Sequence, residues 1–224
     1  MSVAENLNAL RSAIPANVRL VAVSKTKPVK SIQEAYKLAQ RIFGENRVQE
    51  LTQKQPLLPN DIEWHLIGHL HKNKVKYIAP CISLIHSVDS FELLETINKE
   101  AAKCGRTISC LLQFHIAKEE TKFGLSFEEA VALIHSEKFR EMKNVKICGV
   151  MGMATLTDDE SIVRKEFREL QGIFTTLKEQ DFRNSKDFKE LSMGMSGDFE
   201  TAIEMGSNIV RIGTGIFGER KYIL

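Results

Sequence analysis

Residues 19–28 read RLVAVSKTKP, and this stretch indicates the fold. The apolar run 20–23 leaves little polar surface on either face, which is typical of a strand buried on both sides in a parallel sheet. Lys25 follows at the carboxyl end of this strand, with Lys27 two positions on and Pro28 ending the run. Partial burial and a neighbouring like charge both disfavour the ammonium form. We therefore expect the pKa of Lys25 to be lowered and its amine to react with a carbonyl group. The alternative is a surface lysine that closes the strand.

The rest of the chain alternates between strand and helix patterns. Apolar runs predict strands at 20–23, 42–44, 64–68, 82–87, 108–116, 145–151, 191–193 and 208–212, and helical periodicity predicts helices at 29–41, 48–55, 73–78, 91–104, 127–142, 162–178 and 199–205. About eight strands separated by helices are typical of an α/β fold, the single (β/α)8 TIM-type barrel. An open doubly wound sheet is the competing fold. The units occupy nearly the whole chain and no composition break marks a second domain, so we expect one barrel domain over residues 1–224.

The composition argues against several classes of protein. The 224 residues are 43% hydrophobic and 27% charged, as in ordinary soluble globular proteins. A net charge of +2 gives no reason to expect a nucleic-acid or anionic-membrane surface. No apolar run approaches the ~20 residues of a membrane span, and the opening residues lack the apolar core of a signal peptide. The four cysteines show no paired short spacing, so we expect reduced thiols in a cytoplasmic protein.

Polar residues gather at the predicted strand ends, where barrel active sites lie. In chain order, the residues at these strand ends are Lys25, Glu45, Asn46, His69, Asp89, His115, Lys118, Met153, Ser196, Arg211, Gly213 and Thr214. The last two loops read SMGMSGDFETA (192–202) and RIGTGIFGER (211–220). We predict that these two loops form a phosphate-binding cup. Backbone amides at a helix start and side-chain hydroxyls can donate hydrogen bonds to a phosphate, and glycines let the backbone approach it closely. The alternative is that these residues only turn the chain and cap a helix. GTGIFG (213–218) also matches a dinucleotide fingerprint, but the chain ends before the strand and acid which that motif requires.

The histidines suggest a metal-site alternative. His69 and His71 form an HxH pair at a strand end, and His65 lies just before them. Further ligands would have to come from His115 and Asp89. The simpler interpretation is that the histidines line a pocket and that Asp89, with Ser90, caps the following helix.

A lysine after the first strand and a phosphate cup after the last two suit pyridoxal 5′-phosphate (PLP), which offers an aldehyde to the amine and a phosphate to the loops. In order and spacing, the chain resembles the pyridoxal phosphate homeostasis protein family, also called the proline synthetase co-transcribed family. The motifs that carry this resemblance are VAVSKTKP (21–28), FGENRVQE (43–50), WHLIGHLHKNKVKYIAP (64–80), LIHSVDS (84–90), KFGLS (122–126), LSMGMSGDFETAI (191–203) and VRIGTGIFGER (210–220).

The resemblance implies a barrel like the N-terminal domain of alanine racemase, with Lys25 matching the lysine that forms the Schiff base with PLP. It implies that Ser196, Gly213 and Thr214 hold the phosphate and that Arg211 faces the pyridine nitrogen. The implied pocket walls are Asn46, His69 and Met151. Two departures concern the outer face of the cofactor: QFHI (113–116) replaces a more usual asparagine-containing strand end, and Gly197 stands where the family commonly has an acid.

A permanently charged Arg211 would leave the pyridine nitrogen unprotonated and the ring a poor electron sink, which disfavours transamination and decarboxylation. Racemisation needs an acid or base on each face of the substrate carbon. Lys25 could serve one face, but two-domain racemases take the other group, a tyrosine, from a second domain. The tyrosines here are Tyr36, Tyr77 and Tyr222. We therefore predict a PLP-binding protein rather than an enzyme, which buffers PLP or delivers it to PLP-dependent apo-enzymes.

We expect this protein to be a monomer, and we expect Lys118 and Lys122, on a loop before Phe123, to assist release of PLP. The first alternative function is a weak single-domain PLP-dependent amino-acid racemase. The second is a metal-dependent barrel hydrolase.

Overall fold

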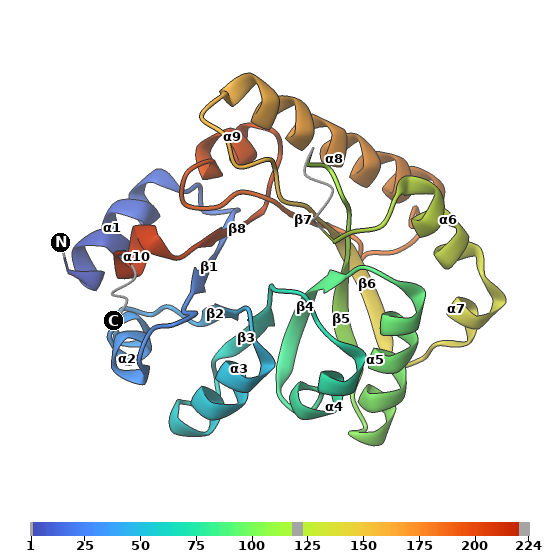
Figure 1. The fold of residues 1–224 in the computed structure, drawn as a ribbon, viewed down its shortest axis with the longest axis horizontal. Helices are drawn as coiled ribbons and strands as arrows, with labels where there is room; N and C mark the ends of the chain where they lie inside the picture. Colours follow the sequence, from blue (N-terminus) through green and yellow to red (C-terminus); the bar gives the residue numbers. More distant parts are fainter. Residues whose placement is uncertain (1, 118–122, 220–224) are drawn as a thin grey trace.

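The computed structural model describes residues 2–117 and 123–219, and its centre is a closed barrel of parallel strands (Figure 1). Each strand pairs with the next along the chain, and the last pairs with the first, with Leu20 opposite Val210. The strands are β1 (Arg19–Val23), β2 (Ile42–Glu45), β3 (Glu63–Leu66), β4 (Ile82–Val88), β5 (Ile108–Gln113), β6 (Val145–Met151), β7 (Glu190–Ser192) and β8 (Ile209–Ile212). This closure confirms the predicted (β/α)8 barrel over the open doubly wound sheet.

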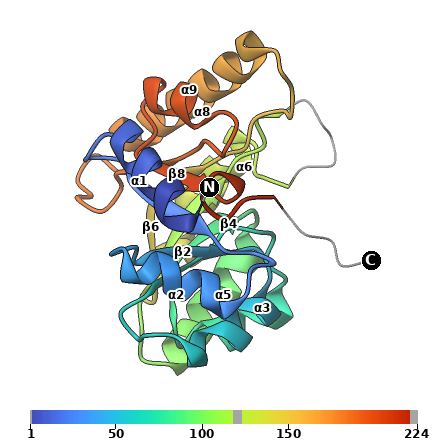
Figure 2. The same cartoon turned by 90° about the vertical axis from the view of Figure 1, so that its left-hand side faces the viewer.

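Helices surround the barrel, and a view turned by 90° places α8 and α9 on one side of it and α2, α3 and α5 on the other (Figure 2). The α-helices are α1 (Val3–Ala13), α2 (Val29–Lys37), α3 (Val48–Lys54), α4 (Val75–Ile78), α5 (Phe91–Lys103), α6 (Phe127–His135), α7 (Glu137–Glu141), α8 (Glu160–Gln180), α9 (Phe199–Glu204) and α10 (Thr214–Phe217). Two 3₁₀ helices, η1 (Gln55–Leu57) and η2 (Lys72–Lys74), precede β3 and α4. None of the helices in the described ranges is long and apolar enough to cross a membrane.

Strand side chains alternate between two apolar clusters, as the pleat of a strand requires. In β1, Ala22 packs into the large cluster between barrel and helices, whereas Val21 packs inside the barrel. The inner cluster is small and is completed by Leu84, Leu111, Cys148, Met151 and Ile209. Both faces of β1 are thus covered, as its apolar run predicts. The remaining interior of the barrel holds polar side chains, which build part of the site.

Several predicted elements differ in their bounds from the observed ones. The helix expected over 127–142 is interrupted at Ser136, whose backbone is extended and whose Oγ accepts a hydrogen bond from the Phe139 N–H at 3.2 Å to begin α7. The strand expected over 108–116 ends at Gln113, because Phe114 pairs only in an isolated bridge with Leu125. Helix α10 is an addition, since its four residues are too few to show a periodicity.

Candidate functional site

Lys25 lies in the turn that joins β1 to α2, at the carboxyl end of the barrel strands. It is half-buried, and the Ser24 N–H before it donates to the Gly44 carbonyl of the neighbouring strand at 3.0 Å. Thr26 after it adopts the left-handed region, with φ of 64°. The ammonium group of Lys27 donates to the carbonyls of Phe217 and Gly218, at 2.9 Å each, and of residue 219 at 3.0 Å. Lys27 therefore ties the Lys25 turn to the segment that follows β8.

The two loops of the predicted phosphate cup do come together. Ser196 Oγ accepts from the amides of Gly213 and Gly215, at 3.4 and 3.5 Å. Thr214, between these glycines, begins helix α10 and is exposed. Asp198 is the N-cap residue of α9, but its Oδ1 accepts from the Met195 N–H at 2.5 Å and so holds the loop rather than the helix. Amides and a hydroxyl thus face one another across the ends of β7 and β8.

Arg211 is almost completely buried: it lies inside the barrel with 3% of its surface exposed. Its guanidinium donates to Ser192 Oγ at 2.6 Å, to the Ser192 carbonyl at 2.9 Å and to the Gly152 carbonyl at 3.0 Å. Burial lowers the pKa of Arg211 to about 10, and the carboxylate of Asp198 opposes that effect. The group is therefore a fixed cation at neutral pH.

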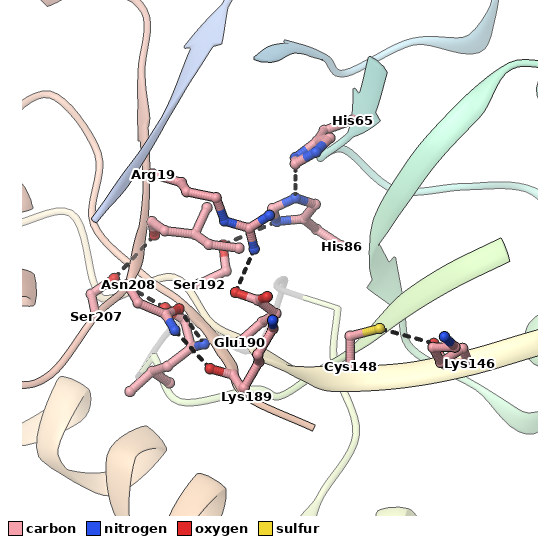
Figure 3. Close-up of polar contacts among 12 residues, drawn as sticks. Arg19, His65, His86, Lys146, Cys148, Lys189, Glu190, Ser192, Ser207 and Asn208 are labelled. Carbon is pink, nitrogen blue, oxygen red and sulfur yellow. Dashed lines mark hydrogen bonds and ion pairs between the residues drawn. The ribbon is translucent and has the colours of Figure 1, made fainter. Parts of the chain in front are cut away.

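Ser192 continues this contact into a buried chain of hydrogen bonds (Figure 3). Its Oγ lies 3.0 Å from His86 Nδ1, and His86 Nε2 lies 2.9 Å from His65 Nδ1. A guanidinium only donates, so the Ser192 hydroxyl accepts from Arg211 and keeps its proton available for His86 Nδ1; in that arrangement neutral His86 donates from Nε2 to His65 Nδ1. Burial, reinforced by the charge of Arg19, lowers the pKa of His65 to about 3. Burial also lowers the pKa of His86 well below its ordinary value, with His65 and the two arginines adding to the effect.

Arg19, the first residue of β1, lies toward the amino ends of the strands. Its guanidinium forms an ion pair with Glu190 of β7 (Figure 3). The barrel interior thus holds both the small apolar cluster, which includes Met151, and buried polar side chains. Met151 is fully buried at the end of β6, so it closes the barrel wall below the strand ends.

Asn46 and His69 follow β2 and β3 and share a hollow of about 650 Å³. A side chain at Gly68 would lie 2.5 Å from the Asn46 carbonyl oxygen, so glycine is required where these two loops touch. Asn46 Oδ1 is buried and has no hydrogen-bond partner in the described part of the chain. The His69 ring stacks on Phe123 with centroids 3.8 Å apart, and its Nδ1 lies 2.9 Å from Asp89 Oδ2.

The structure corrects two interpretations of these residues. Ser90 rather than Asp89 is the N-cap residue of α5, and the Asp89 carboxylate contacts His69 instead. His65 belongs to the barrel interior with His86, away from the HxH pair that the metal hypothesis joined to it. No group of three or more metal-binding side chains occurs within residues 2–117 and 123–219.

Sequence reasoning missed His86 and Ser192, which lie within apolar strands where only their polarity marks them. It named Glu45 as a strand-end residue but did not find its buried partner Lys54, 2.8 Å away. Lys118, Lys122 and Tyr222 lie outside the described residues.

Known proteins are similar to this chain over most of its length. The family model described as "Alanine racemase, N-terminal domain" matches residues 1–221. A pyridoxal phosphate homeostasis protein from Aquifex aeolicus is 42% identical over 205 residues, which cover 91% of this chain and 88% of that protein. One from Helicobacter pylori is 39% identical over 204 residues, which cover 90% of this chain and 88% of that protein.

Solved structures agree with the sequence comparison. PipY from Synechococcus elongatus, solved with PLP bound, superposes with a TM-score of 0.88 at 36% identity, covering 97% of this chain and 100% of PipY. Its form without PLP gives a TM-score of 0.90 at the same identity and coverage. An alanine racemase from Clostridium difficile gives 0.80 at 16% identity, covering 99% of this chain and 61% of the racemase, a likeness of fold alone. These matches confirm the barrel type that the sequence motifs predict.

Proposed function

Because the chain belongs to the pyridoxal phosphate homeostasis protein family, we propose that it binds PLP and takes part in intracellular PLP homeostasis, holding PLP as a Schiff base on Lys25. The observation that carries this proposal is the proximity of the Lys25 turn to the cup. Strand β1, which leads into Lys25, pairs directly with β8, which leads into Gly213. Lys27 also bonds to the carbonyls that follow the cup. An amine and a set of phosphate-binding amides therefore lie at one end of neighbouring strands.

The residues at this end of the barrel fit the chemistry of PLP. The amides of Gly213 and Gly215, with the Ser196 hydroxyl, suit a phosphate, since backbone N–H groups at a helix start bind anions. A Cβ atom at Gly213 would lie 3.2 Å from the Val23 carbonyl oxygen, so glycine keeps the cup close to β1. Asn46 Oδ1, buried and without a partner in the described chain, is an acceptor suited to a polar group of the cofactor.

Arg211 is proposed to face the pyridine nitrogen. When bound, PLP supplies an aldehyde for the amine and a ring that withdraws electrons when its nitrogen carries a proton. Arg211 can only donate a hydrogen bond, so it favours an unprotonated nitrogen. Bonds to Ser192 and Gly152 fix the guanidinium in this role. The chain thus holds the cofactor in a weakly electron-withdrawing form, which suits storage better than catalysis.

The tyrosines support a carrier over a racemase. Tyr36 donates to Asp61, which precedes β3, at 2.7 Å, and so lies toward the amino ends of the strands. Tyr77 lies on the outer helix α4 and is half exposed. Neither described tyrosine supplies a second acid or base at the strand ends. We expect no deuterium incorporation at the α-carbon of alanine in heavy water; incorporation that depends on Lys25 would favour the racemase.

We further propose that residues 1–224 act as one PLP-binding domain, monomeric in the cytoplasm, that passes PLP to PLP-dependent apo-enzymes. The names of the relatives support a role in supply rather than turnover. Recovery of activity by an apo-enzyme mixed with the loaded protein tests the transfer, and sedimentation of the loaded protein tests the monomer.

The absorption spectrum of the purified protein, before and after borohydride reduction, tests the central claim. The native chain with PLP should show a visible band that borohydride removes, and mass mapping should place the reduced adduct on Lys25. Lys25→Ala should lose the adduct. The matched control is Lys30→Ala, which removes an exposed lysine of α2 and should keep it. A native protein that forms no band with added PLP would overturn the proposal.

A further inference from the structure

Three charged side chains from the β2–α3 segment, Glu45, Glu50 and Lys54, form a cluster that the proposed function leaves without a role; Glu45 and Lys54 are buried, and the Glu50 side chain is 21% exposed. The Lys54 ammonium lies 2.8 Å from Glu45 Oε1 and 2.6 Å from Glu50 Oε1. Glu45 has no exposed surface and Lys54 has 6%. Burying charges is costly even when they are paired, so a cluster of this kind calls for an explanation beyond stability.

The cluster forms hydrogen bonds with the backbone on both sides of Lys25. Lys54 Nζ donates to the Ser24 carbonyl at 2.8 Å, and the Thr26 N–H donates to Glu50 Oε1 at 2.5 Å. These two groups belong to the two peptide units that meet at the Cα of Lys25. The Ser24 hydroxyl adds a third bond, to Glu45 Oε1 at 2.7 Å. Three hydrogen bonds from the cluster thus end on Ser24 and Thr26.

The turn needs such support because Thr26 has a φ of 64°. A residue with a β-branched side chain adopts this left-handed region at a cost, and it keeps that conformation only where its surroundings enforce it. The bond from the Thr26 N–H to Glu50 is one such contact, beside the bonds of Lys27 to the Ser24 carbonyl and to the segment after β8. Released from the cluster, the turn would sample other conformations and the amine of Lys25 would point in many directions.

We infer that Glu45, Glu50 and Lys54 are positioning residues that hold the Lys25 turn in the conformation in which its amine reacts with PLP. The inference rests on the proposed function and deepens it. In the reaction, the Lys25 nitrogen bonds to the aldehyde carbon and the aldehyde oxygen leaves as water. An amine already oriented toward that carbon loses less conformational freedom on reaching it, so the reaction is faster.

The test compares Glu50→Ala with a matched control, Glu100→Ala. Both substitutions remove the carboxylate of a helical ion pair, but Glu100 pairs with Lys103 at the far end of α5. Three quantities are measured on each protein. They are the rate of adduct formation with PLP, the affinity for pyridoxamine 5′-phosphate, which has no aldehyde, and amide hydrogen exchange of residues 24–27 in the protein without PLP.

We expect Glu50→Ala to slow adduct formation about tenfold, the factor that corresponds to restored backbone freedom at one residue. Exchange at residues 24–27 should rise, whereas the affinity for pyridoxamine 5′-phosphate should stay unchanged, because the cup is intact. A role in stability alone would slow adduct formation, weaken the affinity for pyridoxamine 5′-phosphate and raise the exchange together, or would change none of the three. Glu50→Gln keeps an oxygen that can accept from Thr26 and should restore both the rate and the protection.

The inference is wrong if Glu50→Ala matches Glu100→Ala in rate and exchange while the native protein forms the adduct. If the native protein itself forms no adduct, the proposed function is wrong and the inference falls with it. Lys54→Met provides an independent variant should Glu50→Ala not fold: it removes the side-chain bond to the Ser24 carbonyl, leaving that carbonyl with the Lys27 N–H, and should also slow adduct formation without changing the affinity for pyridoxamine 5′-phosphate.

Discussion

Lowering the pH from 7 to 5 should destabilise this protein through two histidines inside the barrel. His65 and His86 are buried and neutral, and the pKa of His65 is lowered to about 3. A histidine in the unfolded chain takes up a proton with a pKa of about 6.5. Between that value and the folded pKa, the unfolded state binds more protons, so stability is present above pH 6.5 and is lost as the pH falls.

The magnitude follows from the same linkage. Between pH 7 and pH 5, protonation of one unfolded histidine costs the folded state about 2 kcal/mol. His86 contributes the same amount, because its folded pKa also lies well below its ordinary value and only the unfolded pKa then sets the loss. The two together cost about 4 kcal/mol, a large share of the ~5–15 kcal/mol that stabilises a typical domain.

Urea unfolding followed by the fluorescence of Trp64, the single tryptophan, measures this loss. Trp64 is 2% exposed and directly precedes His65, so unfolding should shift its emission. The double variant His65→Gln, His86→Gln keeps side chains that hydrogen-bond but do not titrate, and its loss between pH 7 and 5 should be smaller by about 4 kcal/mol. The carboxylates are the same in both proteins and cancel in the comparison. Equal losses in the native protein and the double variant would refute the assignment of neutral, buried histidines.

Three further predictions concern the phosphate cup, the contact between strands β6 and β7, and the cysteine thiols. Ser196→Ala should weaken PLP binding about fivefold through the lost phosphate contact and leave pyridoxal, which has no phosphate, unaffected in equilibrium dialysis; equal losses for both ligands would contradict the cup. Gly149→Ala should lower the unfolding free energy by about 3 kcal/mol or more, because a Cβ there would lie 1.8 Å from a β7 carbonyl. Gly105→Ala, in open space with φ of +63°, should lose only about 1 kcal/mol, and similar urea midpoints for both would show that the contact between β6 and β7 at Gly149 is loose. A thiol reagent should label exposed Cys104 in the native protein but Cys110 only after unfolding, because burial raises the pKa of the Cys110 thiol; equal labelling rates by mass mapping would disprove this.

Local patterns in the sequence determined the architecture and the position of the groups at the strand ends. The run 20–23 identified a strand buried on both faces, and the repeated alternation of strands and helices identified the barrel. Because parallel strands align their carboxyl ends, the order of strands alone predicted that Lys25, Ser196 and Gly213 lie at one end. These inferences depend on periodicity and on neighbours along the chain, which a sequence shows directly.

The tertiary structure alone decided which polar groups meet inside the barrel. His86 contacts Ser192 across 106 positions, and such pairs depend on how the strands stagger as the barrel closes, including register shifts within β3, β4 and β5. Helix α10 is too short to be stable by itself and depends on its contacts, such as the bond from Asn6 of α1 to the Ile216 carbonyl at 3.0 Å. The hydrogen bond from Lys54 to the Ser24 carbonyl likewise joins residues that are 30 positions apart. The sequence specified the groups at the site, and packing across the barrel fixed their partners, because hydrogen bonds between distant strands leave no periodic trace along the chain.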